Sequence, residues 1–385
     1  MSDKKLLEDK MPMIPTYRVL SRVQIMAETV DYNHRLMNVP SMWKHTKGEG
    51  VKVVVLDTGC PVHIDLNPCG NKSFIPNYPN DKNGHSTHVG GIIAAIANNG
   101  MGVAGIAPDC EDWYGAVLDG SGSGSIDDII RGIRWATDEV GAQVINMSLG
   151  IPAGIPRIKE LEDACNYARS KGVLVVCAAG NEASNVGQPA MYDSVLAIAA
   201  VDDEQEHARF SNTGKEVDFA AGGVNVFSTY LNNSYAKLSG TSMSSPALTG
   251  IAALIIADEK KDHDKWLTPD ETIAKLKKIA FDIGPNGYDE MYGFGIPVFA
   301  NSDEPVSEQP EQPDEPVPPE EPQSPCKIGL PMVKAFLDAA VKSMDKDDGT
   351  GLPEQQRVAD AVGSGIRAAA KFAGRIDRQG RGTPV

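Results

Sequence analysis

Four side chains of the types used in nucleophilic catalysis follow one another along the chain: Asp57, His85, Asn181 and Ser242. A histidine can take the proton of a serine hydroxyl, and a carboxylate can orient that histidine. An asparagine amide can donate to the oxyanion that forms when a serine attacks a carbonyl. The same residue types also serve as helix caps, turn residues and structural histidines, so each one alone leaves a structural interpretation open.

Asp57 follows the apolar run 51–56 and precedes a glycine turn, where an aspartate can equally cap that turn. His85 and His88 lie in the segment 83–95, which is typical of a loop entering a helix and places both on one helical face. Such a pair could bind a metal or be structural. No third ligand is evident, and the H-E-x-x-H motif is absent from the sequence.

Ser242 lies in the segment 238–246, directly before an apolar helix predicted over 247–257. A serine in a glycine-led turn at a helix start presents its hydroxyl outward, and the helix dipole favours negative charge there. An ordinary N-cap serine is the alternative. Asn181 follows a strand predicted over 173–176, and an ordinary turn asparagine is the alternative at that position.

Taken together, in the order Asp, His, Asn, Ser, these segments resemble the subtilisin family of serine proteases, in which the triad runs Asp, His, Ser. The resemblance extends from about residue 40 to residue 300. Further matching motifs are Gly105–Pro108, Val144–Gly150, Ala200–Asp202, Phe210–Gly214 and Tyr292–Gly295. One position departs from the family pattern, because Ser86 stands where the family usually has glycine. Its hydroxymethyl group could crowd His85 or add a hydrogen bond, and we expect activity to survive.

The resemblance implies a serine endopeptidase that acts on proteins or peptides through an acyl-enzyme. Ser242 would be the nucleophile and His85 the general base and acid. Asp57 would hold the His85 tautomer and stabilise the imidazolium. Asn181 and the Ser242 backbone N–H would form the oxyanion hole, as in the subtilisin that serves as the standard example of this device.

The resemblance also implies a channel in which the substrate backbone pairs as an added strand. The residues on its two sides would be Ser148, Leu149 and Gly150, and Gly122, Ser123 and Gly124; for the second set a flexible loop is the alternative. The pocket for the side chain before the scissile bond would be lined by Ala178, Ala179, Gly180 and Gly187. Small walls predict broad cleavage that favours large apolar residues, and Glu182 at the rim could attract basic ones.

The segment 97–103 resembles the calcium loop of the family, in which carbonyl oxygens and an asparagine amide suit a hard cation. The implied ligands of a Ca²⁺ ion are Ala97, Asn99, Met101 and Val103, with Asp65 from a separate loop. An Asn-Gly turn without a metal is the alternative.

Residues 1–20 form a short polar lead, much shorter than the folding prodomain of secreted subtilisins. Its segment Met13–Pro15, with Val23–Met26 and Pro40–Trp43 further on, resembles the start of intracellular subtilisins. In that group a short extension containing proline lies across the active-site cleft and is removed on activation, and Pro15 would misplace the scissile bond. A disordered tail is the alternative.

The elements that must position these residues are indicated by runs of Val, Ile and Leu at 51–56, 144–147, 173–176 and 195–198. Such runs are typical of parallel strands covered on both faces. Helical stretches lie between them at 125–140 and 157–171. The alternation predicts an α/β fold with a doubly wound, mostly parallel sheet and helices on both faces, as in subtilisins, with function at the carboxyl ends of the strands.

Composition narrows the class of protein and its partners. The chain has 385 residues, 41% of them hydrophobic, and a formal net charge of −16, which argues against nucleic acid as a main partner. Its charged start has no apolar run of secretory-signal length, and no stretch is long enough to span a bilayer. We expect a soluble, cytoplasmic protein without a membrane partner. Its six scattered cysteines are expected to be reduced; a Cys60–Cys69 disulfide is the alternative, and no spacing fits a zinc site.

Four zones follow from composition: an extension at 1–20, a catalytic domain at 21–300, a linker rich in proline and glutamate at 301–325, and a small helical tail at 326–385. The tail has apolar residues at helical spacing and no assigned chemistry. It supports an alternative function, a catalytically weak protease-like scaffold that acts as an interaction or assembly factor through the tail. The resemblance also makes a homodimer an expectation.

Overall fold

The computed structural model describes residues 13–14, 18–23 and 28–300 of the chain. All the described residues belong to the first of two units into which the chain divides, Met1–Glu308. The predicted linker and helical tail, residues 301–385, lie outside the described residues.

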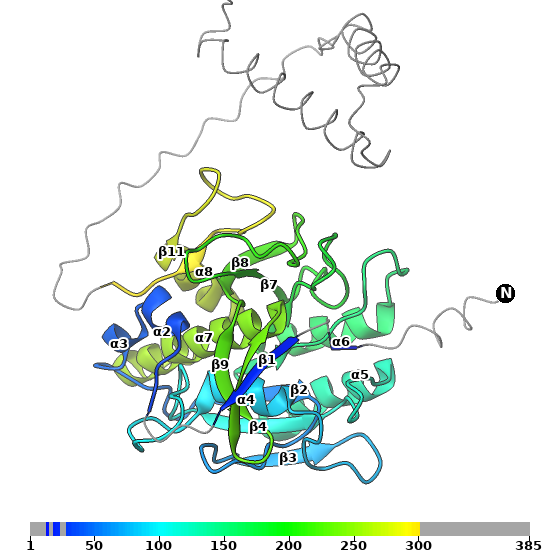
Figure 1. The fold of residues 1–385 in the computed structure, drawn as a ribbon. Helices are drawn as coiled ribbons and strands as arrows, with labels where there is room; N and C mark the ends of the chain where they lie inside the picture. The colour runs from blue at the N-terminus through cyan, green and yellow to red at the C-terminus, as the bar shows by residue number, and fades with distance from the viewer. Residues whose placement is uncertain (1–12, 15–17, 24–27, 301–385) are drawn as a thin grey trace, which may run out of the picture. The chain divides into compact units, whose positions relative to one another are not determined.

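A seven-stranded parallel sheet forms the centre of the first unit, in the order β3-β4-β2-β5-β6-β7-β8 (Figure 1). Every residue of three central strands, β5, β6 and β7, is buried, because helices cover these strands on both faces. The strands are β2 (Lys52–Asp57), β3 (Gly70–Ser73), β4 (Glu111–Ala116), β5 (Val144–Met147), β6 (Leu174–Ala178), β7 (Leu196–Val201) and β8 (Val217–Gly222). The predicted α/β class and its four apolar strands are confirmed.

The helices form two groups around the sheet (Figure 1). α4 (His85–Ala94) and α7 (Thr241–His263) pack against each other, and α7 also packs against β5, β6, β7 and β8. α5 (Ile126–Trp135), continued by the π-helical turn η1 (Ala136–Val140), packs against α6 (Lys159–Ser170). Shorter helices are α2 (Tyr32–Leu36), α3 (Val39–Met42) and α8 (Pro269–Ile279).

Local sequence explains where these helices begin and end. The Ser125 hydroxyl accepts the Asp128 N–H at 3.1 Å and caps α5. Thr268 and Glu271 form a capping box at α8. α6 ends just before Gly172, whose φ of +86° is the left-handed conformation that favours glycine as a helix stop.

A second, antiparallel sheet has the order β1-β10-β9. β9 (Val226–Tyr230) and β10 (Ser234–Ser239) form a hairpin, and β1 (Arg18–Val23) pairs with β10 from Arg18 opposite Ser239 to Val23 opposite Tyr235. Residues 18–23 therefore lie beside the strand that leads into Ser242. A short pair, β11 (Ala280–Phe281) and β12 (Ile296–Pro297), lies near the end of the described chain.

No helix within the described ranges has the length and apolar character needed to cross a bilayer.

Gly91 lies where α4 meets β9, and the contact leaves no room for a side chain. A Cβ there would lie 2.2 Å from Thr229 Oγ1 and 2.3 Å from Ser228 Oγ. Those hydroxyls donate to the carbonyls of Thr87 and His88, so they cannot turn away without losing these bonds. We expect Gly91→Ala to lower the free energy of unfolding by about 1–3 kcal/mol, in spite of its better helix propensity.

Denaturant unfolding measures this effect. The control is Lys278→Ala on the exposed face of α8, which should change stability by no more than about 0.5 kcal/mol. Equal stability of the Gly91→Ala variant and its parent would contradict the close packing of α4 on β9.

Candidate active site

Asp57 ends β2 and His85 begins α4, and their side chains form a hydrogen bond that is closed to solvent. His85 Nδ1 lies 2.9 Å from both carboxylate oxygens, and both side chains are 0% exposed. The Thr58 N–H also donates to Asp57 Oδ1 at 2.7 Å. Because a carboxylate accepts at Nδ1, the neutral ring carries its hydrogen there and keeps its lone pair on Nε2. That tautomer is the one a general base needs.

His88 lies one turn further along α4. Its Nε2 lies 3.2 Å from the Val226 carbonyl oxygen and 3.1 Å from that of Ala236, which joins the helix to β9 and β10. Burial lowers the pKa of His88 to about 3, so the ring is neutral. These bonds favour a structural role for His88 and not a metal-binding pair with His85.

Ser242 is the second residue of α7, and a proline one turn later leaves its carbonyl without a helical donor. Pro246 has no N–H to donate to the carbonyl four residues earlier, which is that of Ser242. This carbonyl instead accepts the Ser148 hydroxyl at 3.0 Å. Ser148 Oγ in turn bonds Ser245 Oγ at 2.9 Å and accepts Asn146 Nδ2 at 3.0 Å. The start of α7 is thus fastened to the end of β5, and Ser242 Oγ lies 3.3 Å from the Ser148 carbonyl oxygen.

Asn181 follows β6 and is fixed by the turn that precedes Ser242. Its Oδ1 accepts the backbone N–H and the hydroxyl of Thr241, both at 2.8 Å. Its Nδ2 packs against Gly240, where a Cβ would lie only 2.9 Å away. The donor end of the amide is therefore directed to the turn that carries the serine.

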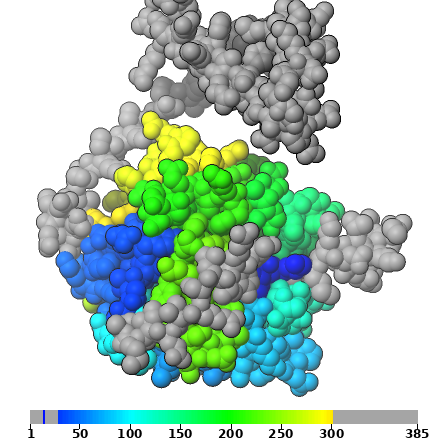
Figure 2. Space-filling view, in the orientation of Figure 1, coloured from blue at the N-terminus to red at the C-terminus, as the bar shows by residue number. Residues whose placement is uncertain are grey.

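The two predicted sides of the substrate channel both bind the chain's own segment 13–14, which is the small dark-blue patch on the right in Figure 2. Met13 and Gly150 exchange two backbone hydrogen bonds of 3.0 Å, and the Ile14 N–H donates to the Gly122 carbonyl at 3.1 Å. Ser123 also forms a bridge with Met13. Gly122 has a φ of +81°, and a Cβ there would lie 2.8 Å from Ile14 Cδ1.

The remaining predicted channel residues support the channel from behind. The side chain of Leu149 is fully buried in the core. A Cβ at Gly124 would lie 2.1 Å from the Val117 carbonyl oxygen, so Gly124 allows its loop to pack closely.

A pocket of about 240 Å³ adjoins the segment 13–14. All four small residues predicted for it line it, namely Ala178, Ala179, Gly180 and Gly187. Glu182 lines it as well, and its Oε2 accepts the Asn181 N–H at 3.0 Å and Asn212 Nδ2 at 2.8 Å. Ile151, Pro152, Gln188 and Asn212 also line the pocket. Asn212 lies in the matching motif Phe210–Gly214, whereas no motif marked Gln188. A larger crevice of about 470 Å³ lies beside Asp31 and contains none of these residues.

Two of the predicted calcium ligands, Asn99 and Val103, contact the buried carboxylate of a third, Asp65. Asp65 is 0% exposed and accepts Asn99 Nδ2 at 2.5 Å, the Val103 N–H at 3.1 Å and the Tyr235 hydroxyl at 3.1 Å. Burial raises the pKa of Asp65. Glu28 Oε2 accepts the Asn99 N–H at 3.0 Å, and no sequence signal marked Glu28. Two carboxylates, an amide and loop carbonyls are a donor set that fits calcium. Ala97 and Met101 lie in the same loop, where the Met101 N–H donates to Asn99 Oδ1.

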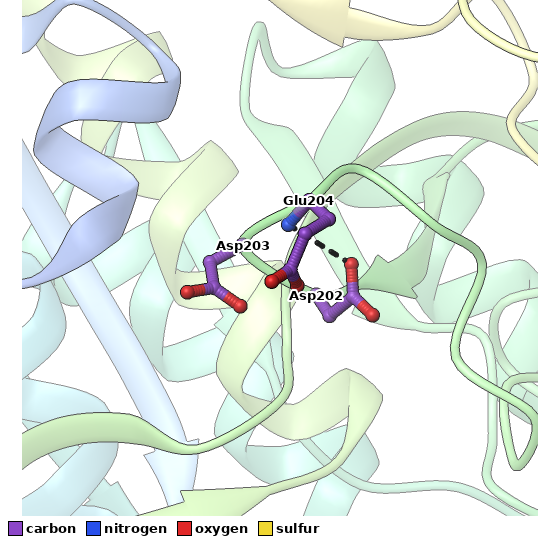
Figure 3. Close-up of side chains that lie close together, drawn as sticks. All are labelled: Asp202, Asp203 and Glu204. Atoms are coloured by element: carbon purple, nitrogen blue, oxygen red, sulfur yellow. Dashed lines mark hydrogen bonds between the residues drawn. The ribbon is translucent and has the colours of Figure 1, made fainter.

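A different acidic group lies on the turn after β7 (Figure 3). The carboxylates of Asp202, Asp203 and Glu204 lie within 4.8 Å of one another. Asp202 Oδ1 accepts the backbone N–H groups of Glu204 at 3.1 Å and Glu206 at 2.9 Å, so the turn itself accounts for its position. Asp203 and Glu204 are exposed, unlike Asp65.

Ser86, the departure from the family pattern, is fully buried beside His85. Its N–H donates to Thr58 Oγ1 at 3.1 Å. Its hydroxyl has no hydrogen-bond partner among the described residues. The hydroxyl therefore adds no bond to His85.

The fold and this constellation define a serine endopeptidase built on a parallel α/β sheet. The profile of the subtilase family matches residues 48–295, more than half of the chain. M-protease of Shouchella clausii is 40% identical over 295 residues, which cover 75% of this chain and 74% of that protein. Subtilisin Savinase of Lederbergia lenta is 44% identical over 252 residues (65% and 89%), and subtilisin DY of Bacillus licheniformis is 41% identical over 279 residues (70% and 97%). The chain belongs to the subtilase family of serine proteases.

The unpartnered Ser86 hydroxyl should cost stability without serving catalysis. We expect Ser86→Ala to raise the free energy of unfolding by about 1 kcal/mol, because it removes a buried polar group that lacks a partner. The rate of peptide hydrolysis should stay within about twofold, since no bond to His85 is lost. Thermal unfolding and a chromogenic peptide assay measure the two effects. A large loss of kcat would show that the hydroxyl acts on His85.

Proposed function

We propose that this chain is an intracellular subtilisin-type endopeptidase, made as a zymogen that its own N-terminal segment inhibits. The observation that carries this proposal is the set of three backbone hydrogen bonds that Met13 and Ile14 make with Gly150 and Gly122. A substrate strand would need the same donors and acceptors. Extension and substrate therefore exclude each other until the extension is removed. The role expected for Pro15 falls outside the described residues.

In the proposed mechanism, Ser242 Oγ turns from the Ser148 carbonyl to His85 Nε2 and gives up its proton as it attacks the scissile carbonyl. Asp57 holds the His85 tautomer and stabilises the imidazolium that forms. Asn181 Nδ2 and the Ser242 N–H donate to the oxyanion, a contribution of about 3–4 kcal/mol per donor. His85 then protonates the leaving amine, and water releases the acyl-enzyme.

We propose broad specificity with large apolar residues favoured before the scissile bond. The alanine and glycine walls of the 240 Å³ pocket support this proposal. Glu182 on the same wall would favour basic side chains as a second preference, although its Oε2 is already engaged by two donors.

We propose that Glu28, Asp65, Asn99 and the carbonyls of the 97–103 loop hold a Ca²⁺ ion. Bound there, the ion would neutralise the two carboxylates and tie the start of the chain to the loop. The Thr29 N–H already donates to the Gly102 carbonyl at 2.8 Å, and the Ala104 N–H donates to the Thr29 carbonyl at 3.3 Å.

A cytoplasmic location is proposed because all five described cysteines are free thiols, which suits a reducing compartment. The Cys60–Cys69 disulfide is not formed. A homodimer stays a proposal from the family resemblance. The scaffold alternative rests on Ser86 and the tail, and it is not favoured, because the family and its relatives are proteases.

Inhibition by the extension depends on Ile14, whose side chain is 9% exposed. Burying an isoleucine contributes about 1.5–3 kcal/mol. Ile14→Glu should therefore weaken binding of the extension in the substrate channel by about 10- to 100-fold. We expect this variant to hydrolyse a chromogenic peptide from the first seconds. The parent should show a lag, during which its intact mass decreases by the mass of the extension. Ser242→Ala should keep its full mass and stay inactive.

The control is Met13→Gln, because that side chain is 54% exposed and the backbone bonds remain. It should show the parental lag. An absence of lag in the parent would contradict inhibition by the extension, and a processed, active Ser242→Ala variant would contradict the assignment of the nucleophile.

Calcium should stabilise the folded chain. An ion present at 100 times its Kd adds about 2.7 kcal/mol to the free energy of unfolding. We expect a chelator to lower the Tm of the inactive Ser242→Ala chain, and Asp65→Asn to remove both this effect and the heat of calcium binding measured by calorimetry. Asp202→Asn should leave both unchanged. The reverse result would place the ion at the acidic turn in Figure 3.

A further inference from the structure

Asp81, a buried acid that no part of the proposed mechanism uses, accepts five hydrogen bonds. Its Oδ1 accepts the Thr58 hydroxyl and the N–H groups of Asn83 and Gly84, each at 2.9 Å. Its Oδ2 accepts the Thr87 N–H at 2.9 Å and the Thr87 hydroxyl at 2.6 Å. Asp81 is 7% exposed, and Thr58 and Thr87 are almost fully buried. The donors come from the end of β2, from the loop and from the first turn of α4.

The first turn of α4 needs such an acceptor. All ten residues of this helix are buried, so its unpaired N–H groups cannot turn to water. The N-cap position is Gly84, which has no side chain to cap them. A larger residue is excluded there, because a Cβ would lie 2.6 Å from the Tyr230 ring and φ is +98°. The first three N–H groups of α4 donate to side chains outside the helix: that of His85 to Asn83 Oδ1 at 3.2 Å, that of Ser86 to Thr58 Oγ1 and that of Thr87 to Asp81. Asp81 thus caps Thr87 and also accepts the hydroxyl of Thr58, the residue that caps Ser86.

Asp81 also connects the two catalytic side chains through Thr58. The Thr58 hydroxyl donates to Asp81 and accepts the Ser86 N–H at 3.1 Å, while the Thr58 N–H donates to Asp57. The Ser86 bond joins the end of β2, which carries Asp57, directly to the start of α4, which carries His85. Asp81 joins the same two elements because it accepts from both Thr58 and Thr87. A shift of the loop would change the separation of Asp57 and His85.

We propose that Asp81 is a positioning residue of the catalytic pair: its carboxylate fixes the start of α4 against the end of β2 and so sets the Asp57–His85 hydrogen bond. It touches neither substrate nor the reacting atoms, and it acts through Thr58 and Thr87.

The test is Asp81→Asn, which keeps size but places an NH₂ group against donors. If the oxygen of the new amide side chain faces Thr58, its NH₂ group faces the Thr87 N–H. Two donors then meet, and no hydrogen bond can form between them. Misplacement of a catalytic group by about 1 Å can cost 10²-fold, so we expect kcat to fall by about 10- to 100-fold with KM within about twofold. The low-field proton NMR signal of His85 Nδ1–H should shift or broaden. Each variant is first treated with immobilised parent enzyme to remove the extension.

Thr87→Val and Thr87→Ser form the matched pair. Valine loses one donor to Asp81 and should lower kcat several-fold, whereas serine keeps the hydroxyl and should restore it. Asp289→Asn is the control for loss of a turn-capping aspartate away from the site, because Asp289 Oδ1 accepts the N–H groups of Met291 and Tyr292. It should leave kcat and the NMR signal unchanged.

An Asp81→Asn variant with a lowered Tm but parental kcat and an unchanged His85 signal would overturn the proposal and leave Asp81 as a structural cap only. If Asp81→Asn does not fold, the Thr87 pair decides: equal kcat in the valine and serine variants would overturn the proposal.

Discussion

Burial of the hydrogen bond between Asp57 and His85 is the constraint on which the rest of the site depends. An ionised carboxylate removed from water is tolerated only where donors replace its hydration. Here the donors are His85 Nδ1 and the Thr58 N–H, which come from two different elements. The bond therefore exists only while β2 and α4 keep their relative position. The sheet places β2 and α4 close to each other. The hydrogen bonds of Asp81 and Thr58 then set their separation accurately enough for the Asp57–His85 bond to form.

The serine half of the site is built by the same principle from other elements. α7 packs against α4, and the first turns of these two helices carry Ser242 and His85. Pro246 releases the Ser242 carbonyl to Ser148, and Thr241 holds Asn181 through two bonds of 2.8 Å. Residues at the ends of three strands, β2, β5 and β6, thus form hydrogen bonds with the first turns of α4 and α7. Because parallel strands end at one edge of the sheet, the four residues can converge although they are far apart in sequence.

Much of this arrangement could be predicted from the sequence, because its signals are local. The apolar runs marked buried strands, and the polar residues that follow them marked the functional edge. Asp81 and Glu28 were missed for a physical reason. The donors to Asp81 come from Thr58, Asn83, Gly84 and Thr87, and only the folded loop brings them to one carboxylate. Glu28 meets Asn99 only because the chain start returns to the 97–103 loop. Neither convergence has a fixed spacing that a motif could contain.

Burial also shifts the pKa of four groups that take no direct part in the proposed mechanism. It raises the pKa of Asp31, Asp112 and Asp218 to about 6 and lowers that of His88 to about 3. Each raised carboxyl contributes stability below its ordinary pKa of 3.8 that is lost as pH rises through about 6. His88 contributes stability above its ordinary pKa of 6.5 that is lost as pH falls toward 3. In acid the two contributions to stability change in opposite directions. Above about pH 7 the contribution of the carboxyl groups is lost and that of His88 is fully present. From neutral pH upward, each of these four groups therefore keeps a single charge state.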